Sequence, residues 1–98
     1  TILAEADLTN TILINANLEN ATLESAKLLD ANLDSANLTN ADLRNTLLAD
    51  ANLSNAILKR ADLSNAVLTG VILAGADLEN AILIDTILNC VGHPICTS

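Results

Sequence analysis

The sequence predicts an all-β fold, a four-sided parallel β-helix, and three regularities carry this prediction. A Leu occupies every fifth position from Leu3 to Leu88 without exception. Two residues before each Leu stands Ala, Thr or Val, and two residues after it Asn, Asp and Gly are frequent. The chain is therefore a series of five-residue repeats, and such short repeats are typical of solenoids.

Neither a helix nor a long strand explains a period of five. In an α-helix a step of five residues turns the chain by about 140°, which would spread the Leu side chains around the whole circumference. In a long strand successive side chains alternate between the two faces, so Leu at an odd period would point alternately into the core and into water. The period is explained when each repeat contains a corner.

Each repeat is predicted to be a three-residue strand followed by a two-residue corner. In the repeat 31–35, Ala31 and Leu33 point inward, Asn32 points outward, and Asp34 with Ser35 makes the bend. If every corner bends by about a right angle, four repeats close one coil, and the chain forms about four and a half coils. The last corner positions carry residues that tolerate a positive φ, namely Asn10, Asn15, Asn20, Asp30, Asn40, Asn45, Asp50, Asn55, Asn65, Gly70, Gly75 and Asn80.

The pattern A-[ND]-L-x-x resembles the pentapeptide repeat family. It occurs at Ala6-Asp7-Leu8, Ala16-Asn17-Leu18, Ala31-Asn32-Leu33, Ala36-Asn37-Leu38, Ala41-Asp42-Leu43, Ala51-Asn52-Leu53, Ala61-Asp62-Leu63 and Ala76-Asp77-Leu78. The resemblance spans Thr1 to about Cys90 and implies a right-handed, four-sided parallel β-helix. Thr replaces Ala at positions 1, 11, 46 and 86, and Val replaces it at 71. Many members of the family have no assigned biochemical role, which implies a scaffold rather than an enzyme.

The repeats predict one domain over residues 1–90 and a C-terminal tail over residues 91–98. The period breaks after Leu88, and the tail contains the only proline, Pro94, which cannot donate a ladder hydrogen bond. We expect this tail to cap the last coil, because an uncovered coil presents unpaired backbone groups. Nothing comparable covers the first coil, so association through the coil ends is also expected.

Residues that are twenty positions apart are expected to stack on neighbouring coils. Asn17 over Asn37 and Asn32 over Asn52 predict ladders of side-chain amides. Asp42 over Asp62 and Asp30 over Asp50 place like charges side by side, which costs stability. Such carboxylates can serve acid/base catalysis or bind a hard cation, but a flat face without a pocket favours a solvated acidic surface.

One outward column is apolar. Leu47, Val67 and Ile87 occupy successive coils, and Ile82 and Ile84 lie on the adjoining face. Exposed apolar patches on proteins often mark contact surfaces. The alternative is that aliphatic residues simply suit the surface of a strand. The five residues are the predicted interface for a protein partner or a second copy.

Charge and composition exclude several function classes. Twelve acidic residues against four basic ones give a net charge of −8, which disfavours direct binding to nucleic acid. No apolar run reaches the roughly 18 residues of a membrane span, and no signal-peptide pattern is visible. With only two cysteines, a reducing compartment is the default, so the cytoplasm is the expected location.

No cofactor and no catalytic set are predicted. The spacing Cys90-x-x-His93-x-x-Cys96 offers three ligand types that suit zinc, but three ligands do not close a structural site. A disulfide between Cys90 and Cys96 is the favoured alternative in an oxidising setting. No Ser/His/Asp set, phosphate-binding loop or dinucleotide turn occurs, so the chain is not expected to be an enzyme.

Two functions remain from the sequence. The first is a non-catalytic scaffold that binds a protein partner or itself. The second comes from the family resemblance, which implies imitation of DNA toward DNA gyrase through Asp42, Asp62, Asp30 and Asp50. An acidic rod suits a basic groove that recognises backbone charge. The acidic surface is interrupted by four cations, Lys27, Arg44, Lys59 and Arg60. We therefore rank this function second.

Overall fold

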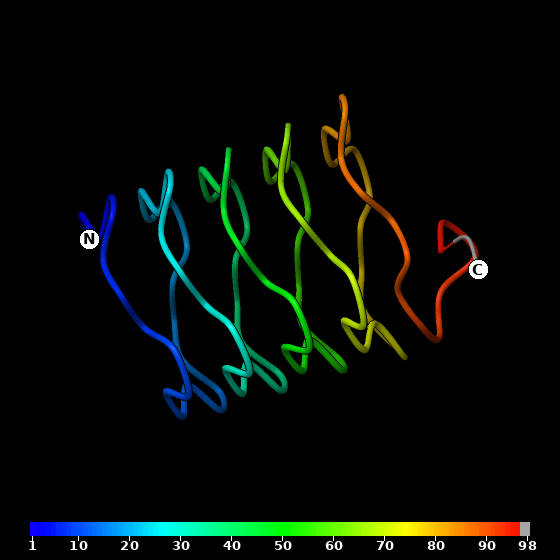
Figure 1. Ribbon diagram of the computed structural model, residues 1–98, viewed down its shortest axis with the longest axis horizontal. Coiled ribbons are helices and arrows are strands. Elements are labelled where there is room, and N and C mark those ends of the chain that lie inside the picture. The colour runs from blue at the N-terminus through cyan, green and yellow to red at the C-terminus, as the bar shows by residue number, and fades with distance from the viewer. Residues whose placement is uncertain (97–98) are drawn as a thin grey trace.

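The computed structural model describes residues 1–96, which wind into a short stack of four-sided coils (Figure 1). Complete coils comprise residues 1–20, 21–40, 41–60 and 61–80, and a partial fifth coil comprises residues 81–91. The first coil and the C-terminal segment lie at opposite ends of the stack (Figure 1). The molecule measures 31 × 24 × 20 Å.

The coils are joined by single-residue parallel bridges rather than by long strands. Within residues 1–96 there is no helix, and every bridge pairs one outward residue with its counterpart on the next coil. Partners are twenty residues apart from Ile2↔Thr22 to Val67↔Ile87. The stacking register that the sequence predicts is therefore observed over four coils.

Three kinds of backbone hydrogen bond connect neighbouring coils, and in one of them the N–H of the positive-φ corner residue donates to the following coil, as from Asn40 to the carbonyl oxygen of Lys59 at 2.9 Å. The N–H of each inward Leu from Leu3 to Leu73 donates to the following coil, as from Leu23 to the carbonyl oxygen of Asp42 at 2.8 Å. The N–H of the outward residue donates to the preceding coil, as from Asp42 to the carbonyl oxygen of Ala21 at 2.9 Å. An internal coil therefore pairs its backbone on both sides, which compensates for its short strands.

The corners are tight turns that begin at Leu and end at the next small residue. The N–H of Ala36, for example, donates to the carbonyl oxygen of Leu33 at 3.0 Å. The residue before the small residue has a positive φ, between 56° and 63° for the non-glycine residues from Glu5 to Asp85. Asn and Asp tolerate this conformation and Gly adopts it freely, which explains why they predominate at these positions, although Glu5, Ser25, Ser35 and Arg60 adopt it too.

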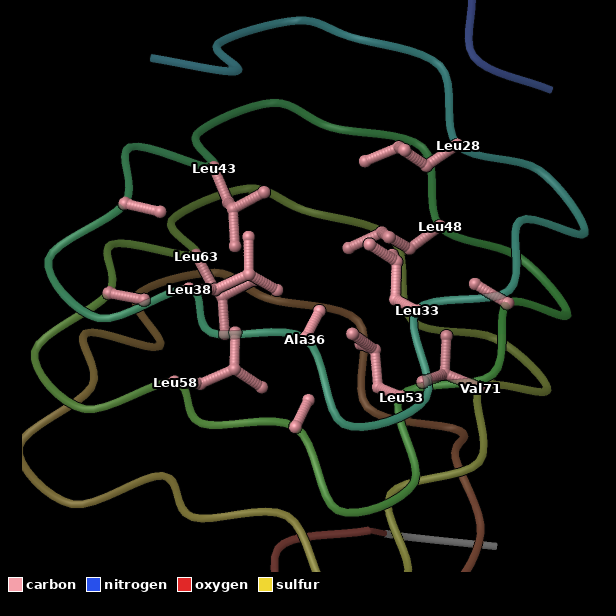
Figure 2. Close-up of a cluster of buried hydrophobic side chains, with 14 of the residues drawn as sticks. Leu28, Leu33, Ala36, Leu38, Leu43, Leu48, Leu53, Leu58, Leu63 and Val71 are labelled. Atoms are coloured by element: carbon pink, nitrogen blue, oxygen red, sulfur yellow. The ribbon is translucent and has the colours of Figure 1, made fainter. Parts of the chain in front are cut away.

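The interior is filled by Leu and Ala from all four sides. The Leu side chains from Leu23 to Leu73 are fully buried, and they point toward the axis of the coil (Figure 2). At the ends of the stack, Leu3, Leu8, Leu13, Leu78, Leu83 and Leu88 are only half-buried. The side chains fill the interior, and residues 1–96 enclose no pocket.

The repeat ends with a change of register. Val91 pairs with Ile72, so the last bridge spans nineteen residues instead of twenty. The ladder thus reaches one residue past the boundary of 90 that the sequence predicts. Cys90 is bonded to Cys96, and Ile95 and Cys96 pack against the core. Thr97 and Ser98, which belong to the predicted tail, lie outside the described residues.

Candidate interaction surface

The predicted apolar column is assembled by the fold. Leu47 bridges Val67, and Val67 bridges Ile87, so the three side chains stack on successive coils at a spacing of about 4.8 Å. Leu47 and Ile87 are 38% and 48% exposed, and Val67 is half-buried between them. A continuous aliphatic column therefore runs along one side of the third, fourth and fifth coils.

Two further predicted residues extend this column around a corner. Ile82 bridges Asp62 on the adjoining side, and Ile84 lies in the corner between Ile82 and Ile87. Ile84 is 64% exposed, the largest exposure among the five predicted residues. We call Leu47, Val67, Ile82, Ile84 and Ile87 the apolar strip.

The sequence prediction missed other exposed aliphatic residues. These are Ile2, Ile12, Ile14, Ile57, Ile72 and Val91. Several of them lie in the first or last coil, where one neighbouring coil is missing and side chains lose cover on that side. Sorting the outward residues by twenty would have identified Ile72, which follows Asn32 and Asn52 in one column, but Val91 joins this column only through the change of register.

The acidic column combines Asp42 and Asp62 with a cation. Asp42 and Asp62 form a parallel bridge, as predicted. Arg44 donates two hydrogen bonds to the Asp42 carboxylate, from Nε to Oδ1 at 2.9 Å and from Nη2 to Oδ2 at 2.7 Å. Arg44 Nη2 also lies 3.7 Å from Glu24 Oε1. The column therefore carries its own counter-ion.

This ion pair shifts the pKa of both side chains, Asp42 and Arg44. The hydrogen bonds from the Arg44 side chain lower the pKa of Asp42 below its usual value, against an opposing contribution from burial. The backbone N–H and the charge of Arg44 act in the same direction. The Asp42 carboxylate in turn raises the pKa of Arg44. Asp62 accepts hydrogen bonds from the backbone N–H and the hydroxyl of Ser64 at 3.0 and 2.6 Å.

Asp30 and Asp50 are corner residues rather than strand residues. Both are exposed and have a positive φ, of 58° and 62°. The Asp50 carboxylate lies against Gly70 of the next coil, where an added side-chain carbon would collide with it. These two acids therefore occupy a different edge of the rod from Asp42 and Asp62.

The outward Asn and Asp residues stabilise their own corners. Oδ1 of Asn37 accepts hydrogen bonds from the N–H and the hydroxyl of Thr39, at 3.1 and 2.7 Å. The same contact with the backbone N–H two residues later recurs at Asp7, Asn17, Asn32, Asp42, Asn52, Asp62 and Asp77. Asx residues commonly make this bond in turns.

The predicted amide ladders are therefore wrong in their bonding, although the stacking is right. Asn17 bridges Asn37, and Asn32 bridges Asn52. Within residues 1–96 no hydrogen bond joins the two amides of either pair, because each Oδ1 faces its own corner. The side chain of the Asn or Asp in each repeat therefore stabilises the turn that follows it in the same coil, and not a contact between coils.

The remaining predicted features give no chemical site in the described part of the chain. Cys90 and Cys96 are bonded to each other, so two of the three ligands in the zinc-like spacing are used. Residues 1–96 hold no group of three or more potential metal ligands. No helix in this part of the chain is long and apolar enough to cross a membrane.

A family model for pentapeptide repeats matches the chain over residues 1–40, 36–73 and 61–91, with 8 copies. Together these matches cover the four coils and the partial fifth coil up to Val91. No curated protein matches the chain.

Three solved structures of pentapeptide repeat proteins resemble the chain. One from the thylakoid lumen of Arabidopsis thaliana is 27% identical over 90% of the chain, with a TM-score of 0.85. One from Nostoc Pcc 7120 is 38% identical over 86% of the chain, with a TM-score of 0.79. One from the cyanobacterium Cyanothece 51142 is 40% identical over 90% of the chain, with a TM-score of 0.51.

The chain spans only 62%, 68% and 65% of these three proteins. The similarity extends over 86–90% of the chain. The right-handed, four-sided β-helix expected from the repeats is thereby confirmed.

Proposed function

The chain belongs to the pentapeptide repeat family, and from this premise we propose that it is a non-catalytic scaffold that binds a protein partner or a second copy of itself. The apolar strip is the proposed contact surface. Its five residues come from three coils, and the backbone ladder fixes their spacing. A rigid surface of this kind loses little conformational entropy when a partner binds.

The observation that carries the proposal is the stacking of Leu47, Val67 and Ile87 beside the exposed Ile82 and Ile84. Contiguous exposed apolar side chains on proteins mark interaction sites more often than single ones do. A small-molecule site would instead need a concave pocket with a few convergent polar groups. The exposed strip suits the surface of another protein.

Substitution of Val67 by Lys tests the proposal, because Val67 is the middle residue of the column. Thr69→Lys is the matched control: it adds the same charge at an exposed corner position of the same coil. Self-association is measured by sedimentation over a range of concentrations. A photo-crosslinking amino acid in place of Ile84, used in cells that express the chain, captures a partner protein.

We expect a concentration-dependent mass or a discrete crosslinked product, lost in Val67→Lys and kept in Thr69→Lys. A monomer at every concentration that also yields no discrete crosslinked product would refute the proposed surface. Equal losses in both variants would assign the effect to added charge rather than to the strip.

Imitation of DNA toward DNA gyrase is the second candidate function. It is favoured by the net charge of −8 and by the stacking of Asp42 and Asp62 on neighbouring coils. The two hydrogen bonds from Arg44 to Asp42 weaken it, because they neutralise one of the two stacked carboxylates. This candidate therefore stands behind the apolar strip.

The cytoplasmic location stays a prediction. The state of Cys90 and Cys96 in cells tests it, because cytosolic thioredoxin and glutathione keep most thiols reduced. Blocking free thiols at lysis, followed by mass measurement, is expected to show both cysteines alkylated if the chain is cytoplasmic.

A further inference from the structure

The change of register at the C-terminal end places Cys90 inside the coil. At the regular period, position 90 would be a corner residue with a positive φ, equivalent to Asp85 with its φ of 56°. The bridge between Ile72 and Val91 is one residue short of that period, so Cys90 takes the inward position of the small residue. Its side chain is 8% exposed.

The segment that follows folds back to meet this cysteine. Cys90 and Cys96 form a disulfide with a Cα–Cα distance of 4.9 Å. Gly92 has a φ of 90° and lies so close to Ala74 that an added side-chain carbon would be 2.9 Å from the Ala74 nitrogen. Ile95 and Cys96 pack against the core. The segment 92–96 thus lies at the C-terminal end of the stack (Figure 1).

Hydrogen bonds contribute little to holding this segment. The N–H groups of Ile95 and Cys96 donate to Nδ1 and to the carbonyl oxygen of His93, at 3.2 and 2.9 Å, so both bonds stay within the segment. Val91, by contrast, is paired with the fourth coil through two backbone bonds, to Val71 at 2.9 Å and from Leu73 at 2.8 Å. The ladder ends at Val91, and beyond it the segment is held by the disulfide and by the packing of Ile95 against the core.

We propose that the Cys90–Cys96 disulfide is a redox-sensitive latch that closes residues 92–96 over the C-terminal end of the core. A dithiol reductant opens the latch. Its first thiolate attacks Sγ of Cys96, because Cys96 is half-buried and Cys90 is buried, and the Cys90 thiolate leaves. The second thiol of the reductant then displaces Cys96. Two electrons and two protons pass to the protein, and the reductant becomes a disulfide.

Opening is expected to be local. The ladder bonds of residues 21–80 do not involve residues 92–96, so the inner coils keep their pairing when the latch opens. An oxidising compartment keeps the latch closed, and a compartment with reduced thiols holds it open. The proposal goes beyond the scaffold function and does not depend on it, because it concerns the order of the segment alone.

Amide hydrogen exchange of the whole chain, with and without dithiothreitol, tests the latch. We expect the amides of Ile95 and Cys96 to exchange at least about tenfold faster after reduction, because the disulfide no longer restricts the segment. Amides of residues 21–60 should keep their rates. The double variant Cys90→Ser/Cys96→Ser should match the reduced chain whether or not the reductant is present.

Three results would overturn the proposal. The first is equal exchange of Ile95 and Cys96 in the oxidised and reduced chains. The second is two free thiols per denatured chain after air oxidation and before any reductant is added. The third is faster exchange throughout residues 21–60 on reduction, which would make the disulfide a requirement of the whole fold rather than a local latch.

Discussion

Arg44 binds both oxygens of the Asp42 carboxylate with two side-chain hydrogen bonds, of 2.9 and 2.7 Å, while the backbone N–H of Arg44 donates a third at 3.2 Å. Asp62 stacks directly on Asp42 in the next coil. The guanidinium therefore compensates the repulsion that two stacked carboxylates would otherwise produce. Bidentate pairs of this kind are among the stronger ion pairs because the planar fork matches the carboxylate.

Replacement of Arg44 by Gln should give a stability loss that depends on pH. The pKa of Asp42 is lower in the folded chain than its ordinary value of 3.8, so the ion pair stabilises the fold above that pH. Its contribution is lost as pH falls through the folded pKa. The difference between wild type and Arg44→Gln in urea unfolding should therefore be present near neutral pH and shrink below about pH 4.

Arg44→Lys is the control for charge without the bidentate fork, and we expect it to lie between the other two chains. A difference between wild type and Arg44→Gln that stays constant down to about pH 2 would contradict the role given to the Asp42 titration.

Truncation of an inner Leu should be costly. Leu38 is fully buried in the second coil, and its removal leaves a cavity that the flanking coils cannot close without breaking their ladders. We expect Leu38→Ala to lose about 2 to 5 kcal/mol of unfolding free energy. Asn40→Ser, at the exposed corner of the same coil, should lose under about 1 kcal/mol, since only its bond from Arg60 Nε is removed. Similar losses in denaturant unfolding would contradict the inward assignment.

Removal of a corner acceptor should also destabilise the coil. Asn37→Ala deletes the acceptor for the N–H and the hydroxyl of the buried Thr39. We expect a loss of about 1 kcal/mol in urea unfolding, because the Thr39 hydroxyl loses its partner. Asn37→Asp keeps the acceptor and should restore most of the stability. If Asp proves as damaging as Ala, the corner bond is not the reason for the [ND] position.

The candidate action on DNA gyrase has an electrostatic signature. If the acidic column imitates DNA, the chain should inhibit supercoiling at low ionic strength, and added salt should remove the inhibition. Asp42→Asn/Asp62→Asn should weaken it more than Glu19→Gln/Glu79→Gln, a pair of exposed corner residues outside the stacked column with the same change in charge. Equal weakening by both pairs would indicate net charge rather than the column, and no inhibition in low salt would exclude this function.

Much of the fold follows from the period of five. The inward Leu positions, the stacking of Leu47 on Val67 and of Val67 on Ile87, and the positive φ at Asn and Asp corners were all predictable, because each depends only on position within a repeat. The bonding of the outward amides was not. Stacking distance allows Asn17 to meet Asn37, but each side chain reaches the N–H of its own corner, which competes for the same oxygen.

The sequence by itself determined the coil, its four sides and its core, because a strict repeat of five is satisfied when four corners per coil turn every Leu inward. Only the tertiary structure decided how the ladder ends after Leu88, where the sequence already shows that the repeat breaks, and which charges pair. The register shortens by one residue before Val91, which turns Cys90 inward toward Cys96. Arg44 donates hydrogen bonds to the Asp42 carboxylate, whereas Ser64 donates hydrogen bonds to the Asp62 carboxylate. The charge pairing depends on which groups the Arg44 side chain can contact, and the register depends on how the ladder terminates. The five-residue pattern specifies neither.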